Sequence, residues 1–82
     1  MILRHPLNTA VAAELTGYLK AARMTQAQLA RETGISQVVL QRYLAGDRDI
    51  QVAHIAKCAA VLGFQPYDLM FRAVNRVAEE SK

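Results

Sequence analysis

The sequence predicts an all-α protein with five helices joined by short connections. Apolar residues recur three or four positions apart along nearly the whole chain, and no segment shows the strict alternation of a half-buried strand. Glycines and prolines divide this pattern at intervals. A chain of 82 residues is long enough for one small core. We therefore expect residues 1–82 to form a single compact domain.

The first helix is expected to begin after Pro6, with Asn8 or Thr9 as its N-cap, and to end near Arg23. Four apolar residues at helical spacing would form its buried stripe: Val11, Leu15, Leu19 and Ala22.

A short second helix and a tight turn follow. Thr25 is a natural N-cap, and Gln28, three residues later, can return the bond in a capping box. Gly34 ends this helix, because the chain reversal there favours a positive φ. Ile35 would fill the turn, and Ser36 would cap the next helix.

The third helix has one apolar and one outward face. Leu40, Tyr43 and Leu44 fall on the buried side, and Val39 lies at its edge. The outward face carries Gln37, Val38, Gln41 and Arg42. Leu29 and Ala30 of the second helix would pack where the two helices cross, since alanine permits a close approach. Two short helices joined in this way are typical of a helix-turn-helix.

Turn residues around Gly46 separate the third helix from a fourth, which is expected from about Gln51 to Leu62 and ends at Gly63. Its expected buried stripe is Val52, Ile55, Ala56, Ala59 and Leu62.

An extended C-terminal helix is expected from about Pro66 to Glu80. Its apolar residues exceed what one buried face requires: Tyr67, Leu69, Met70, Phe71, Val74 and Val77. We expect some of them to contact a partner, and a homodimer interface is predicted at Met70, Phe71, Val74 and Val77.

The positive charge of the chain is concentrated in one segment. The net charge is +3, and five basic but only two acidic residues lie between Lys20 and Arg48, whereas the rest of the chain holds five of each. A polyanion would be attracted to this segment.

Several other classes are not favoured. No apolar run approaches the about 18 to 20 residues that cross a bilayer, so no membrane association is expected. The chain shows no secretory signal, and the single Cys58 cannot form an internal disulfide, which together favour a cytoplasmic location. His54 and Cys58 are too few ligands for a metal site, so Cys58 is expected to be buried and His54 to lie on the surface. We expect neither a cofactor nor enzymatic activity, because no phosphate-binding glycine loop, acid pair or activated nucleophile is present.

Taken in order, three motifs resemble the phage repressor and Cro-type (xenobiotic response element) helix-turn-helix family over about Leu19 to Met70. They are T-Q-x-x-L-A from Thr25, G-I-S from Gly34, and A-x-x-L-G from Ala59, with Gly46 closing the third helix. The resemblance implies a lambda-repressor-like five-helix bundle with a helix-turn-helix at helices two and three. It also implies a bacterial or phage DNA-binding transcriptional regulator, such as a Cro-like or immunity repressor, whose third helix enters the major groove.

The resemblance also implies roles for individual residues. The four outward residues of the third helix would read bases, with glutamine amides suited to adenine, Val38 to a thymine methyl and Arg42 to guanine or a phosphate. Expected phosphate contacts are Thr25, Gln26, Ser36, Arg48, Arg23 and Lys20. Two positions depart from the family pattern. Many relatives have a glutamate at the position of Leu44, and a basic residue followed by a proline after the closing glycine, where this chain has Asp47, Arg48 and Asp49. The two aspartates would repel phosphates, which Arg48 could offset.

Two expectations concern the ends of the chain. Residues 1–7 would form a flexible arm, in which Arg4 and His5 reach along double-stranded DNA or are simply disordered. The apolar excess of the last helix leaves an alternative open, that of a protein-binding helical module such as the antitoxin of a toxin–antitoxin pair. Such a protein could also bind its operator.

Overall fold

The computed structural model describes residues 6–80, and all regular structure in that range is α-helical. Five helices follow one another in the order predicted: α1 (Pro6–Ala21), α2 (Gln26–Thr33), α3 (Gln37–Leu44), α4 (Val52–Leu62) and α5 (Pro66–Glu80). The predicted all-α fold is therefore confirmed.

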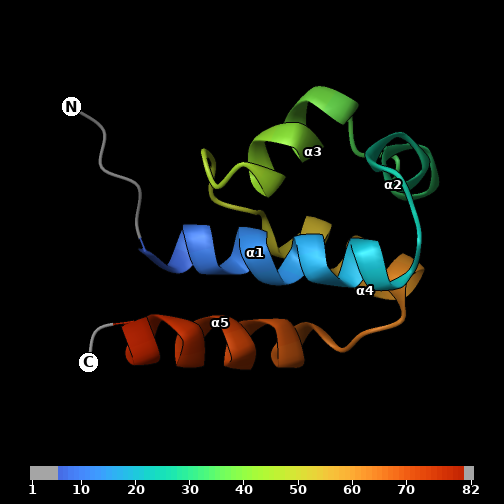
Figure 1. Cartoon of the computed structure of the whole chain (residues 1–82). Coiled ribbons are helices and arrows are strands. Elements are labelled where there is room, and N and C mark those ends of the chain that lie inside the picture. The colour runs from blue at the N-terminus through green and yellow to red at the C-terminus, as the bar shows by residue number, and fades with distance from the viewer. Residues whose placement is uncertain (1–5, 81–82) are drawn as a thin grey trace.

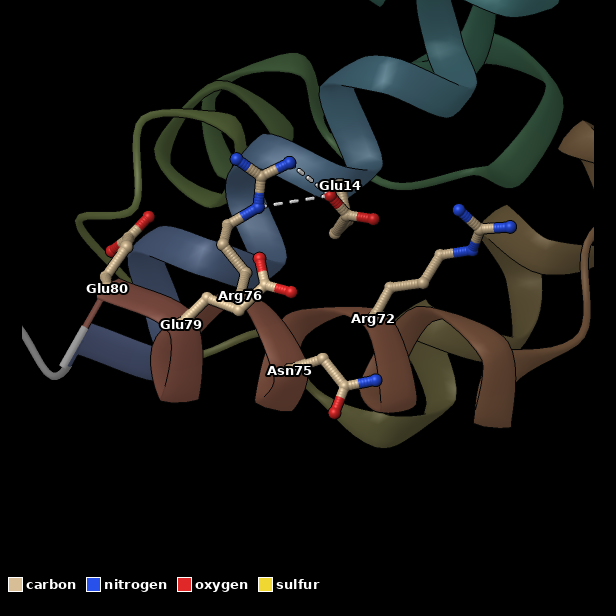
Figure 2. Close-up of a pocket in the computed structure, with 6 residues that line it drawn as sticks. All are labelled: Glu14, Arg72, Asn75, Arg76, Glu79 and Glu80. Carbon is tan, nitrogen blue, oxygen red and sulfur yellow. Dashed lines mark hydrogen bonds and ion pairs between the residues drawn. The ribbon is translucent and has the colours of Figure 1, made fainter. Parts of the chain in front are cut away.

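The two longest helices, α1 and α5, lie side by side and run in opposite directions (Figure 1). The helices α2 and α3 lie on the other side of α1, and α4 passes behind it (Figure 1). An ion pair between Glu14 on α1 and Arg76 on α5 joins the two long helices across their outer surface. Figure 2 shows the Arg76 guanidinium directed at this carboxylate, with Nε donating to Oε2 at 3.2 Å.

Every helix contributes a fully buried side chain to one core. The largest such side chains are Leu15, Leu29, Leu40, Cys58 and Leu69, one from each helix in chain order. Since apolar burial is the main stabilising term in folding, this shared core couples the packing of the five helices.

The first helix differs from its prediction at both ends. It begins at Pro6, so Asn8 and Thr9 lie within its first turns and do not cap it. Proline suits the first helical position because its missing N–H needs no partner there. Pro6 and Leu7 therefore do not belong to the predicted arm, whose Arg4 and His5 lie outside the described residues.

At its other end α1 stops at Ala21, and the predicted core residue Ala22 is exposed. The Arg23 N–H donates to Lys20 O at 3.0 Å and the Met24 N–H to Leu19 O at 3.2 Å. This Schellman closure places Arg23 in the left-handed region with φ 55°, a conformation usually taken by glycine.

The inward face of α4 is displaced from the predicted stripe. Ile55 and Ala59 are buried and Leu62 is partly buried, but Val52 is 82% exposed and Ala56 is also exposed. Cys58 is fully buried in their place. Val52 is the first residue of α4, and with Ala56 it lines an apolar groove of about 430 Å³ between α4, α1 and α5.

None of the helices in residues 6–80 combines the length and apolar character needed to span a membrane.

Candidate nucleic-acid interface

The unit formed by α2, the turn and α3 is fixed by short-range hydrogen bonds. The Gln28 N–H donates to Thr25 Oγ1 at 3.1 Å, and the Thr25 N–H donates to Gln28 Oε1 at 2.8 Å, which confirms the predicted capping box. Gly34 adopts φ 76° and closes α2 with an N–H bond to Ala30 O of 2.9 Å. Ser36 caps α3 by accepting from the Val39 N–H at 3.2 Å.

A buried threonine supports this turn, and the sequence analysis did not identify it. Thr33 is 8% exposed. Its hydroxyl donates to Leu29 O at 2.7 Å and accepts from the Ile35 N–H at 3.2 Å. Because the hydroxyl satisfies two backbone groups inside the core, it fixes the angle at which the chain leaves α2. Ile35, only 4% exposed, then fills the turn as predicted.

The outward face of α3 is available for a ligand. On its inward side, Leu40 and Tyr43 are buried, and Val39 and Leu44 are half-buried. All four residues of the outward face are exposed, and Val38 is 62% exposed. Within residues 6–80, neither glutamine amide nor the Arg42 guanidinium on this face has a hydrogen-bond partner. Their donors and acceptors are therefore free to pair with another molecule. The members of this surface are Gln37, Val38, Gln41 and Arg42.

The residues predicted to contact phosphates lie at the starts of α2 and α3 and in the turns that flank them, apart from Lys20, which lies in the last turn of α1. Thr25 and Ser36 are exposed, and Gln26 is half-buried at the first position of α2. The two hydroxyls accept a backbone N–H as caps, and each keeps a hydrogen that it can donate to an anion. Helix N-termini of this kind attract negative charge.

Five cations in residues 20–48 are exposed and have no acidic partner among the residues that the structure covers. They are Lys20, Arg23, Arg31, Arg42 and Arg48. Exposed cations without internal counterions raise the positive potential around them. An external polyanion can supply the missing counterions.

The aspartates after α3 are not equivalent. The Asp49 carboxylate accepts a hydrogen bond from the Asn8 amide of α1, which holds it against the body of the protein. Asp47 follows the end of α3, with its N–H bonded to Arg42 O at 3.0 Å, and is exposed. Both carboxylates are exposed, and the predicted repulsion of phosphates by these aspartates stays a prediction.

His54 is not a simple surface residue. Its side chain is partly buried, and its Nδ1 lies 2.7 Å from the hydroxyl of Tyr43 on α3. The two rings also pack at a centroid distance of 5.6 Å. Sequence spacing gave no signal for this pair, because the two residues lie on different helices.

Cys58 is buried as predicted, and desolvation raises the pKa of its thiol to about 11. No three potential metal ligands gather within residues 6–80.

The apolar residues of α5 divide into two sets. Met70 and Val77 are partly buried and pack against the core. Phe71 and Val74 are 68% and 52% exposed, and Tyr67, one turn before Phe71, is 69% exposed. We call Tyr67, Phe71 and Val74 the outer α5 stripe.

Known proteins share this arrangement. A family model described as helix-turn-helix matches residues 18–69. The crystal structure of the clp gene regulator ClgR from Corynebacterium glutamicum is 20% identical, with a TM-score of 0.86 over 96% of this chain and 84% of that one. A hypothetical transcription factor, NHTF from Neisseria, is 22% identical, with a TM-score of 0.77 over 94% and 86% of the two chains. A search of curated proteins found no match. Since the family model covers more than half of the sequence, the chain belongs to the Cro/C1-type helix-turn-helix family.

Proposed function

We propose that this protein is a transcriptional regulator that represses genes by occupying operator DNA through α3. The observation that carries the proposal is the outward face of α3, whose polar groups have no partner within residues 6–80 and which lies in the segment that holds the excess of positive charge. Two solved structures with this fold are described as a gene regulator and a hypothetical transcription factor, which supports the same proposal.

In the proposed complex, α3 lies in the major groove. Gln37 and Gln41 are one helical turn apart and exposed, so their amides can each donate to and accept from an adenine edge. Val38 contacts a thymine methyl group, and Arg42 pairs with a guanine or holds a phosphate at the edge of the groove. The Cro-like or immunity-repressor role belongs to this proposal.

Phosphate contacts orient α3 in the groove. The hydroxyls of Thr25 and Ser36 and the amide of Gln26 meet the backbone at the helix N-termini, where the helix dipoles favour anions. Lys20, Arg23 and Arg48 add charge around them.

The decisive experiment is selection from random duplex oligonucleotides, followed by titrations of the selected site and of unrelated DNA. Substituting Gln37→Ala or Gln41→Ala should lower the preference for the selected site by about 1–3 kcal/mol and leave binding to unrelated DNA unchanged. Gln65→Ala, an exposed glutamine between α4 and α5, is the matched control. Equal losses on both DNAs would exclude the two glutamines from base reading. If the wild-type protein binds no duplex DNA at low salt, the proposal is wrong.

We also propose that the protein binds two-fold operators as a dimer through α5. Phe71 and Val74 of the outer α5 stripe would meet the second copy, with Met70 and Val77 beneath them. Sedimentation at high micromolar concentration should show a dimer that Phe71→Glu dissociates. A single protomer, both free and on the selected DNA, would contradict this.

The exposed outer α5 stripe also favours a second candidate, in which α5 holds a different protein, as an antitoxin holds its toxin. Salt separates the two activities, because DNA binding weakens steeply as salt rises and apolar protein binding does not.

A further inference from the structure

The outward face of α3 is useful for recognition only if the helix keeps its position on the body of the protein. Its inward contacts are largely apolar, through Leu40 and the ring of Tyr43, which are 0% and 3% exposed. Apolar burial is non-directional. Together with the short turn from α2, it holds the helix against the core, and close packing limits its rotation and its sliding along the axis.

A directional contact to another helix supplements this packing and the bonds of the turn. The hydrogen bond of 2.7 Å between the Tyr43 hydroxyl and His54 Nδ1 is the only side-chain hydrogen bond between α3 and another helix within residues 6–80. A displacement of about 0.8 Å would stretch it to the limit of hydrogen bonding. Hydrogen bonds to base edges have the same distance limits, so a displacement of α3 large enough to break this contact would also be large enough to break a base contact.

We propose that His54 is a positioning residue for DNA recognition, which acts through Tyr43 to set the placement of α3 and so the discrimination between DNA sequences. This inference rests on the proposed function. His54 lies on α4, outside the helix-turn-helix unit, and acts only through the buried back of α3. Removing the bond lets α3 take several placements, and a displaced helix still meets the phosphates but pairs poorly with the bases.

The test uses three single substitutions in the whole chain. Tyr43→Phe keeps the buried ring and removes the hydroxyl, and His54→Leu removes the imidazole nitrogen. His54→Asn is the matched control, because its amide bears polar atoms on Cγ, where the histidine carries Nδ1. Urea denaturation of each variant establishes that the fold is intact at the temperature of the binding assay.

Tyr43→Phe and His54→Leu should each reduce the ratio of specific to non-specific DNA binding by about fivefold to tenfold. The double variant should lose no more than either single variant, and His54→Asn should retain most of the ratio. Equal loss on both DNAs, additive losses in the double variant, or a His54→Asn variant as poor as His54→Leu would each overturn the proposal.

A second measurement separates this proposal from the proposed function. Amide ¹H–¹⁵N spectra of the free protein should show displaced resonances along Gln37–Leu44, on the outward face of α3 as well as beside Tyr43, for both Tyr43→Phe and His54→Leu. Unperturbed α3 resonances would refute the positioning role even if DNA binding is established. Failure of the wild-type protein to bind DNA would refute the proposed function and the recognition role together, while the spectra would still report whether the bond positions α3.

Discussion

Arg23 has a strained backbone conformation that lowers the stability of the protein. Replacing it with glycine should raise the stability and at the same time weaken DNA binding. Its φ of 55° lies in the left-handed region, which costs a residue with a Cβ about 1–2 kcal/mol. Glycine removes that cost but adds about 0.4–1 kcal/mol of conformational freedom to the unfolded chain. The net prediction for Arg23→Gly is a stabilisation of about 0.5–1 kcal/mol.

For a domain of this size, that gain corresponds to a rise in Tm of roughly 3–6 °C. Thermal and urea denaturation measure it directly. The closing hydrogen bonds of α1, from the N–H groups of Arg23 and Met24, involve only backbone atoms and remain available to glycine. An unchanged or lower Tm would refute the account of strain at this position.

The same substitution should weaken DNA binding, because Arg23 is a proposed phosphate contact. Losing one contact should reduce the slope of log K against log salt by about 0.9. Arg23→Asn is the control for charge, since asparagine tolerates the left-handed region and is also neutral. Arg23→Lys keeps both the charge and the strain, so it should leave Tm unchanged and preserve the slope. If Arg23→Gly shows the same slope of log K against log salt as the wild type, Arg23 does not contact a phosphate.

Three further predictions test individual positions. Gly17→Ala should stabilise the protein by about 0.5–1 kcal/mol in urea denaturation, because Gly17 is exposed within α1 and an added Cβ meets nothing within 4 Å. A loss of stability would contradict this. Gly46→Ala should lower the stability by about 1–2 kcal/mol in the same assay, because φ is +76° at Gly46 and the added Cβ would lie 3.4 Å from Thr9 Cα. An unchanged stability would show that the turn after α3 adapts to the side chain. At pH 8, Cys58 should react with a thiol reagent at least about 100-fold more slowly in the folded protein than in denaturant. Burial raises the pKa of the thiol to about 11, so little reactive thiolate is present in the folded protein. Similar rates in both states would mean that the core opens readily.

Features set by neighbours in the sequence were predictable. The capping box of Thr25 and Gln28 and the cap at Ser36 each span three residues, and the left-handed Gly34 follows directly from the requirement of a turn. The exposure of the outward α3 residues follows from helical period alone. Their contacts with bases and phosphates remain predictions.

Features set by tertiary contacts were not predictable. Val52 lies at helical spacing from Ile55, but its place at the start of α4 puts it on the rim of a groove. The bond between Tyr43 and His54 depends on how α3 and α4 are placed in space. For the same reason, no local pattern could pair Asp49 with Asn8, which lie 41 residues apart.

The shared core, to which every helix contributes one fully buried side chain, affects the thermodynamics of recognition. A helix anchored in this way becomes ordered when the chain folds, before any ligand arrives. Association with DNA then carries no additional entropic cost for ordering α3. The heat-capacity change of DNA binding should reflect only the surfaces buried between protein and DNA. It should lack the larger negative change that a segment folding on binding would add.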